Sequence, residues 1–156
     1  MAFYSTKRFG PISTGHRQWR DDGHCAYMHG YGRTMKVIFG ASALDDKGWV
    51  VDFGGLKDFK KWLEGEWDHR MLIASDDPAL AQFIEMDNQG LISLNVMEVS
   101  YGHGPGIEAS CKYVYDYLDP YVKEMTAGRC WVESIEIFEH ENNSAIMVRD
   151  QVNADC

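Results

Sequence analysis

The segment from His24 to Tyr31 concentrates side chains that can act as bases, nucleophiles or metal ligands. It holds the thiol of Cys25 and the imidazole of His29 within a few residues of each other. If extended backbone begins here, the odd-numbered residues from Cys25 to Tyr31 share one face and His24 lies on the other, because alternate residues of a strand share a face. The pattern indicates a site at which a thiol and an imidazole reach one substrate.

A metal site is a second reading of the same region. Catalytic zinc usually takes three protein ligands and leaves the fourth position to water or substrate. His16 and His29 can supply two of the three. Spacing alone leaves the third ligand open, and it is equally compatible with ordinary polar residues near the start of a strand.

Three further acidic positions and one histidine carry possible chemistry. In the adjacent pair Asp68-His69, the carboxylate can set the tautomer of the imidazole and raise its basicity, as general acid/base catalysis needs. The same pair also fits a solvated helix end. Glu139 follows an alternating stretch whose acidic residues can form a wet strand face, and Glu108 stands where a helix dipole favours a carboxylate.

The residue patterns in the first third of the chain predict strands. Residues 1–9 fit a strand, which Gly10-Pro11 interrupts before a second short stretch that carries His16. Residues 34–39 and 49–53 are both rich in β-formers and flank a turn, so they predict a hairpin.

Helices and strands alternate over the rest of the chain. Apolar residues recur at helical spacing over 56–63, 78–86 and 107–118, with the last helix expected to stop near Pro120. Strand patterns cover 91–96, 131–138 and 145–148, the last two joined by a turn at Asn142-Asn143. The order predicts one α+β domain over residues 1–156, in which an antiparallel sheet carries helices on one face.

Composition narrows the function classes. The 156 residues are 45% hydrophobic and 25% charged, as in an ordinary globular domain, and a net charge of -9 disfavours nucleic acid as a partner. The four cysteines, Cys156 among them, are widely spaced, and no cationic segment with an apolar stretch opens the chain, so we expect a reduced, cytoplasmic setting. No apolar run approaches the roughly 20 residues of a membrane span, so no membrane partner is expected.

Several short motifs occur together and in one order along the chain. They are Ser13–Arg17, Cys25–Gly30, Gly48–Phe53 with Leu56-Lys57, Trp67–His69, Gly106–Glu108, and Phe138-Glu139 with Asn142-Asn143. On these motifs the sequence resembles the 6-pyruvoyltetrahydropterin synthase and 6-carboxytetrahydropterin synthase family.

The resemblance implies a tunnelling fold, with a four-stranded antiparallel sheet, two helices on one face, and subunits that assemble into a homo-oligomer, by resemblance a hexamer, with active sites between them. The gap of three residues between Cys25 and His29 resembles the carboxy branch of the family. That branch implies a carbon–carbon lyase of queuosine and deazapurine biosynthesis. Its substrate would be 7,8-dihydroneopterin triphosphate, and its products 6-carboxy-5,6,7,8-tetrahydropterin, acetaldehyde and triphosphate.

The resemblance also implies roles for individual residues. Cys25 matches the general base, whose thiolate a nearby Zn²⁺ would favour. Asp68 and His69 match the acid/base pair, which acts across a subunit boundary. Glu139 matches the carboxylate that anchors the pterin through its amino group and ring nitrogen, and Glu108 is expected to contact substrate. Zinc would polarise the side-chain oxygens of the substrate.

The chain departs from the family pattern at the metal. Where the family usually reads His-Gly-His, this chain reads His29-Gly30-Tyr31. Either Tyr31 or His24 is then the third ligand beside His16 and His29. Weaker zinc binding, a changed metal and loss of the usual activity all stay open. The alternatives to the lyase are 6-pyruvoyltetrahydropterin synthase activity and a pterin-binding homologue with an altered metal site and no turnover.

The chain is also longer than the usual enzyme between His69 and Glu108, where it adds a helix and a strand. We interpret this insertion as a surface elaboration, with a cover for the pocket or a changed oligomer as alternatives. His103 in its glycine-rich exit is a weak candidate for substrate contact, and a solvated loop histidine is the simpler reading. Three arginines near the metal segment, which could meet the triphosphate or lie on the surface, are Arg17, Arg20 and Arg33.

Overall fold

A six-stranded sheet organises the chain, in the strand order β4-β3-β1-β2-β5-β6. The computed structural model describes residues 1–150. The four strands on one side of the sheet pair antiparallel with their neighbours, and they are β1 (Phe3–His16), β2 (His29–Ala41), β5 (Cys130–His140) and β6 (Asn143–Val148). On the outer edge of β1, β3 (Arg70–Ala74) and β4 (Leu94–Met97) add in parallel.

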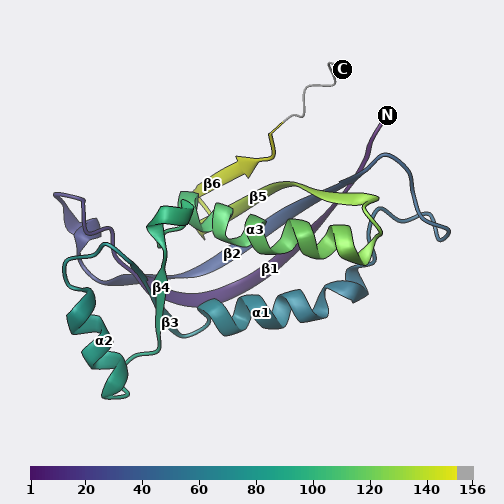
Figure 1. Ribbon diagram of the computed structural model, residues 1–156. Helices are drawn as coiled ribbons and strands as arrows, with labels where there is room; N and C mark the ends of the chain where they lie inside the picture. Colours follow the sequence, from purple (N-terminus) through teal and green to yellow (C-terminus); the bar gives the residue numbers. More distant parts are fainter. Residues whose placement is uncertain (151–156) are drawn as a thin grey trace.

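Two long helices cover one face of this sheet (Figure 1). They are α1 (Lys57–Trp67) and α3 (Ile107–Met125), while the short α2 (Leu80–Asn88) lies apart, between β3 and β4 in the chain. The α+β class and the antiparallel core of four strands with two helices on one face are confirmed. The insertion supplies α2 and β4 as expected, and also β3, which the sequence pattern did not predict.

The core lies between the sheet and the two long helices. Val37 and Phe39 of β2 alternate with more exposed neighbours, so their side chains point toward the helices. Phe59 of α1 is fully buried and meets Phe9 of β1 edge to face, with ring centroids 5.1 Å apart. The apolar periodicities that predicted α1 and α3 therefore correspond to their buried faces.

The strand partner of β2 was predicted wrongly. Residues 49–53 form no strand, and β2 pairs instead with β1 and β5. Asp52 starts the short 3-10 turn Phe53–Leu56, where its side chain accepts a hydrogen bond from the backbone N–H of Gly54 at 2.8 Å. Alternating apolar residues select a buried face, but they do not specify which strand pairs with which.

The first strand is longer than predicted. β1 runs through Gly10-Pro11, with a shift of register between Phe9 and Ile12 in place of a break. Gly10 has a φ of 99°, and a Cβ there would lie 2.5 Å from the backbone oxygen of Arg33. Glycine at this position therefore lets β1 stay paired to β2 across the irregularity.

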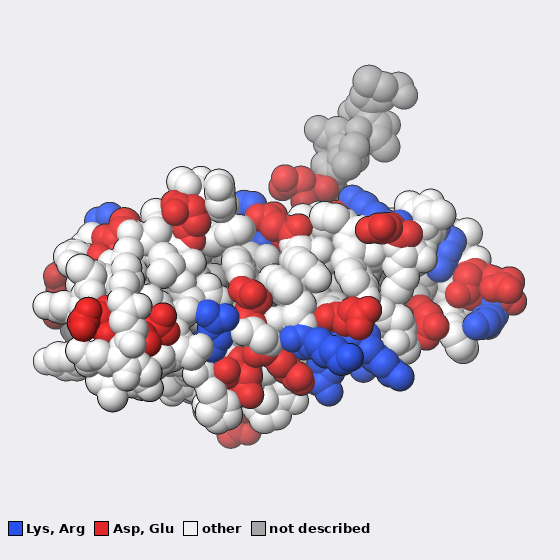
Figure 2. All heavy atoms as spheres, turned by 60° about the horizontal axis from the view of Figure 1, so that its bottom comes forward, with Lys and Arg blue, Asp and Glu red and all other residues white. Residues whose placement is uncertain are grey.

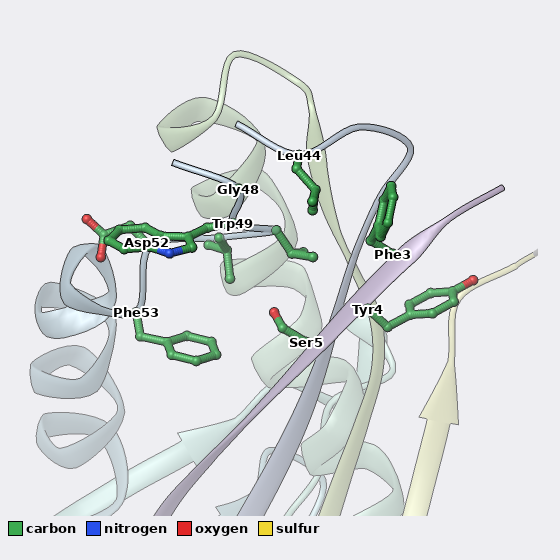
Figure 3. Close-up of a pocket in the computed structure, with 10 residues that line it drawn as sticks. Phe3, Tyr4, Ser5, Leu44, Gly48, Trp49, Asp52 and Phe53 are labelled. Atoms are coloured by element: carbon green, nitrogen blue, oxygen red, sulfur yellow. The ribbon is translucent and has the colours of Figure 1, made fainter. Parts of the chain in front are cut away.

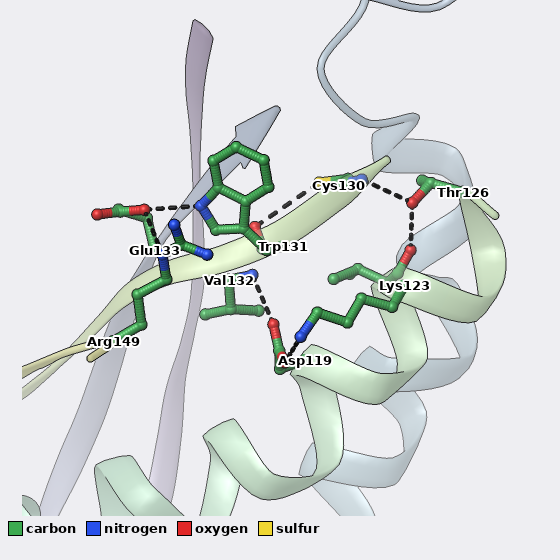
Figure 4. Close-up of polar contacts among 9 residues, drawn as sticks. Asp119, Lys123, Thr126, Cys130, Trp131, Val132, Glu133 and Arg149 are labelled. Atoms are coloured by element: carbon green, nitrogen blue, oxygen red, sulfur yellow. Dashed lines mark hydrogen bonds and ion pairs between the residues drawn. The ribbon is translucent and has the colours of Figure 1, made fainter. Parts of the chain in front are cut away.

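The helix α3 also continues past its predicted end near Pro120, to Met125. Val122, in the added turn, is fully buried against the core, and such burial offsets the backbone hydrogen bond that proline cannot donate. Asp119 ties this turn to the sheet, because its carboxylate accepts from the backbone N–H of Val132 at 3.0 Å and pairs with Lys123 at 2.6 Å (Figure 4). The helix end is thus held at a fixed place over β5.

The described surface carries both signs of charge. On the face shown in Figure 2, acidic and basic side chains are interspersed and separated by uncharged surface. Within residues 1–150, no helix combines the length and the apolar character that crossing a membrane requires.

Candidate functional site

Three aromatic rings that the sequence singled out meet at one end of β1 and β2. His16 is paired in register with His29, and two positions along the strands Thr14 is paired with Tyr31. The ring centroids of His16 and His29 lie 4.5 Å apart, and that of Tyr31 lies 5.6 Å from His16 and 5.4 Å from His29. All three rings lie on the helix side of the sheet, because their strand positions continue the buried alternation of the core.

A buried arginine lies directly beneath this ring cluster. Arg33, two residues beyond Tyr31, is 1% exposed, and its guanidinium donates to the hydroxyl of Ser110 at 3.0 Å and to the backbone oxygen of Pro105. It also lies 3.3 Å from Nδ1 of His16. The sequence analysis grouped Arg33 with arginines that could meet a triphosphate. Its burial excludes such direct contact in this structure. The sequence held a signal of this burial, because Arg33 shares a strand face with the apolar Met35.

Burial and the guanidinium charge set the protonation of the cluster. Burial, then the charges of Arg33 and His29, lower the pKa of His16 to about 3, so this imidazole is neutral at physiological pH. Burial also lowers the pKa of Arg33 to about 10, which leaves it protonated. Burial and then the Glu139 charge raise the pKa of Tyr31, so the phenol keeps its proton.

The cluster does not present the lone pairs that a three-ligand zinc centre needs. Arginine only donates hydrogen bonds, so Nδ1 of His16 accepts from Arg33, and the proton of the neutral ring then sits on Nε2. His29 is oriented as metal ligands usually are, since its Nδ1 lies 2.6 Å from the backbone oxygen of Tyr27 and leaves Nε2 free. Tyr31 is a neutral phenol. Of the three rings, His29 alone offers a ready ligand atom.

A wider set of donors does not replace the missing ligand atoms. Among residues 1–150, no three His, Cys, Asp or Glu side chains are grouped to hold a metal ion. His24, the alternative third ligand, is exposed in the short 3-10 turn His24–Ala26. In this arrangement the residues do not fit the zinc centre that the resemblance implies, and zinc binding stays a prediction.

The thiol of Cys25 belongs to the connection between the strands that carry the rings, and not to either strand. The parity expected from Cys25 onward is wrong, because Cys25 is in the 3-10 turn and β2 begins only at His29. Cys25 is half-buried, and its charge as a thiolate adds to burial and to the Glu139 charge in raising the pKa of Tyr31. The thiol is therefore within electrostatic range of Tyr31, although a turn positions it.

Two carboxylates approach the same group of residues from other elements. Glu139 lies near the end of β5, where the preceding Phe138 pairs with Thr34 of β2, and its charge acts on both Tyr31 and Arg33. Glu108 is exposed in the first turn of α3, and its charge also acts on Arg33. Residues from β1, β2, β5 and α3 thus converge around one buried cation.

Asp68 and His69 form the expected pair. Nδ1 of His69 lies 3.1 Å from a carboxylate oxygen of Asp68, and the His69 side chain is 81% exposed. His69 has a φ of 57°, and its backbone N–H donates to the backbone oxygen of Ser13 at 2.7 Å. A hollow of about 400 Å³ has both His69 and His29 in its wall. His69 therefore shares the wall of this hollow with His29, and its imidazole is open to solvent.

The remaining candidates have structural partners. Arg17 pairs with Asp77, and Arg20 pairs with Asp76, both acidic residues of the insertion. His103 is not solvated as the simpler reading had it, because its Nε2 lies 2.7 Å from the carboxylate of Asp116 on α3 and its side chain is only 13% exposed.

A second hollow, of about 500 Å³, lies away from all these residues (Figure 3). Its wall is largely apolar and includes Phe3 of β1 with Trp49 and Phe53 from the long connection before α1. Exposed aromatic surface of this kind is typical of contacts between proteins. None of the sequence-predicted site residues lines it, so the candidate site remains at the other end of β1.

Comparisons with known proteins identify the family of the chain. The family model described as 6-pyruvoyl tetrahydropterin synthase matches residues 5–150. The protein of Rickettsia bellii named 6-carboxy-5,6,7,8-tetrahydropterin synthase is 35% identical over 133 residues, which cover 84% of this chain and 90% of that protein. The Rickettsia conorii protein of the same name is 35% identical over 75 residues, so this chain matches only 54% of its length.

Solved structures show the same fold at lower identity. An uncharacterized protein of Wolinella succinogenes, WS1659, superposes with a TM-score of 0.82 at 19% identity, covering 96% of this chain and 99% of that one. The 6-pyruvoyl tetrahydropterin synthase of Plasmodium vivax superposes with a TM-score of 0.68 at 12% identity, covering 97% and 99%. The fold is thus the tunnelling fold that the sequence motifs implied, and the chain belongs to the 6-pyruvoyl tetrahydropterin synthase family.

Proposed function

We propose that this protein converts 7,8-dihydroneopterin triphosphate and water to 6-carboxy-5,6,7,8-tetrahydropterin, acetaldehyde and triphosphate, as a carbon–carbon lyase. The observation that supports this most is that the charges of Glu139 and Cys25 both act on Tyr31, which groups a candidate pterin anchor and a candidate proton acceptor around one phenol. The names of the curated relatives favour the carboxy branch.

Each residue has a part that its environment supports. Glu139 accepts two hydrogen bonds from the amino group and ring N–H of the pterin, a planar bidentate contact. Cys25, as thiolate, removes a proton from the side chain of the substrate. His69 returns protons to the substrate, with Asp68 accepting a hydrogen bond from its Nδ1–H. The fixed charge of Arg33 stabilises negative charge that develops near Tyr31.

The test is a product assay on the full chain. Protein is incubated with 7,8-dihydroneopterin triphosphate, with and without added zinc, and pterins and acetaldehyde are followed by mass spectrometry. We expect carboxytetrahydropterin and acetaldehyde in equal amounts, both lost in Cys25→Ala. A pyruvoyl product would instead assign the chain to the other branch. The two zinc arms test the expected metal dependence separately.

A second candidate function is pterin binding without turnover. The mismatch between the ring cluster and a zinc centre favours it specifically, since catalysis in this family is expected to need the metal. This candidate requires tight pterin binding that is unchanged in Cys25→Ala, with no product formed under either zinc condition.

The pterin anchor can be tested by affinity alone. Loss of a bidentate contact to a charged group costs about 1.5–3 kcal/mol, so Glu139→Gln should weaken pterin binding by roughly 10–150-fold. Glu136→Gln is the matched control, because Glu136 lies on the same strand and accepts from the Ser144 hydroxyl instead. Equal affinities of the two variants, measured by calorimetry, would remove Glu139 from the site.

The family also leads us to propose a cytoplasmic homo-oligomer, hexameric by resemblance, in queuosine or deazapurine biosynthesis. Sedimentation measures the subunit number.

A further inference from the structure

The segment that carries Cys25 is held from outside by the inserted part of the chain. Residues 17–28 connect β1 to β2, and only the three residues of a 3-10 turn are regular within them. Two adjacent carboxylates in the turn before α2, Asp76 and Asp77, reach across to this segment. Local hydrogen bonds alone would leave a segment of this kind free to move as a unit.

One guanidinium joins the insertion to the turn of Cys25. Arg17 donates through Nε and one terminal nitrogen to both carboxylate oxygens of Asp77, each at 2.7 Å. Its other terminal nitrogen donates to the backbone oxygen of Ala26, the residue after Cys25, at 3.3 Å. The planar guanidinium therefore fixes the direction from Asp77 to Ala26, which the flexible ammonium of lysine could not do.

The anchor on the insertion side is itself rigid. The Asp77 side chain is 1% exposed, and it also accepts from the backbone N–H of Ala79 at 2.8 Å just before α2. The Arg17 guanidinium carbon lies 5.9 Å from the ring centre of Phe83, a buried residue of α2. The neighbouring link from Asp76 to Arg20 is more exposed on both sides.

Inside the segment, the backbone of Cys25 is held at both ends. Its N–H donates to the Asp21 carboxylate at 3.2 Å, and its carbonyl accepts from the N–H of Gln18 at 2.9 Å. These contacts make residues 18–26 one small unit. The position of that unit against the ring cluster then depends on the contacts that leave it, of which the Arg17 bridge is the least exposed.

We propose that Asp77 is a positioning residue, which holds the turn of Cys25 in place through Arg17. The insertion between His69 and Glu108 is then part of the working site, and not only a surface elaboration. The inference rests on the proposed function for the catalytic role of Cys25, but the place of the thiol can be measured without turnover.

The test measures alkylation of Cys25 by iodoacetamide at a fixed neutral pH, in a Cys156→Ser background of the full chain. Peptide mass spectrometry separates Cys25 from Cys111 and Cys130, whose thiols are buried. Asp77→Asn removes the ion pair, and Asp76→Asn is the matched control. We expect the alkylation rate of Cys25 to change at least threefold in Asp77→Asn and less than twofold in Asp76→Asn.

Arg17→Lys is the second variant, and it keeps the proposal testable if Asp77→Asn does not fold. Lysine retains the charge opposite Asp77 but cannot also reach Ala26, so we expect the same change at Cys25. With pterin substrate, both variants should lower kcat with KM nearly unchanged. Alkylation of Cys25 at the parental rate in the folded variants would overturn the proposal. If the variants change the alkylation rate but the parent protein forms no product, the proposed function is overturned and the positioning role of Asp77 is not.

Discussion

The buried imidazole of His16 predicts a loss of stability as the pH falls. Its pKa lies near 3 in the folded protein, because burial and the neighbouring Arg33 and His29 disfavour the charged ring, against 6.5 for a free histidine. As the pH falls, the unfolded chain takes up this proton first, so protonation favours unfolding. The stability that neutral His16 contributes is complete above about pH 6.5 and is lost progressively down to about pH 3.

The size of the effect follows from the two pKa values. Between about pH 7.5 and about pH 5, protonation of His16 in the unfolded chain alone costs the folded state about 2 kcal/mol. Only 2% of this residue is exposed, so solvent screening does not reduce the figure much. With a urea dependence of about 2 kcal/mol per molar, the unfolding midpoint should fall by roughly 1 M from this source.

The measurement compares the protein with His16→Gln in urea at both pH values. Glutamine keeps an acceptor for Arg33 and does not titrate, so all other groups cancel in the comparison. Protein concentration is held constant, and both proteins are treated with a chelator, because assembly or a bound metal would shift stability by mass action. Equal losses of unfolding free energy in both proteins, within about 0.5 kcal/mol, would refute the reasoning about His16.

Two further predictions concern the ring cluster and the end of α3. The double variant Tyr31→His with Arg33→Met should bind zinc at least about tenfold more tightly than the parent, since it adds an imidazole and frees Nδ1 of His16. Competition with a coloured chelator measures the two affinities. Equal affinities would contradict our account of why the ring cluster does not fit a zinc centre. Asp119→Ala should lower the free energy of unfolding by about 1–3 kcal/mol, because it leaves the buried N–H of Val132 without an acceptor. Lys123→Met removes only the half-exposed partner and should cost less than about 1 kcal/mol in the same urea experiment, so similar losses would contradict this assignment.

Much of the fold was predictable because the signals that carry it are local. The helical spacing of Phe59 and Leu63 and the alternation before Glu139 reflect burial on one face, and each is readable within a few residues. The partner of β2 was not predictable in this way. Residues 49–53 carry a strand-like pattern, yet β1, the preceding strand, offers β2 a longer pairing.

For the candidate site, too, some features follow from the sequence and others only from the tertiary structure. The sequence by itself determined the kinds of reactive group present, the adjacency of Asp68 and His69, and the family to which their order points. Only the tertiary structure decided that Arg33 is a buried cation beneath His16, and that Asp77 reaches Arg17 beside the turn of Cys25. Burial and ion pairing depend on residues far apart in the chain, and local periodicity carries no information about which distant groups will meet.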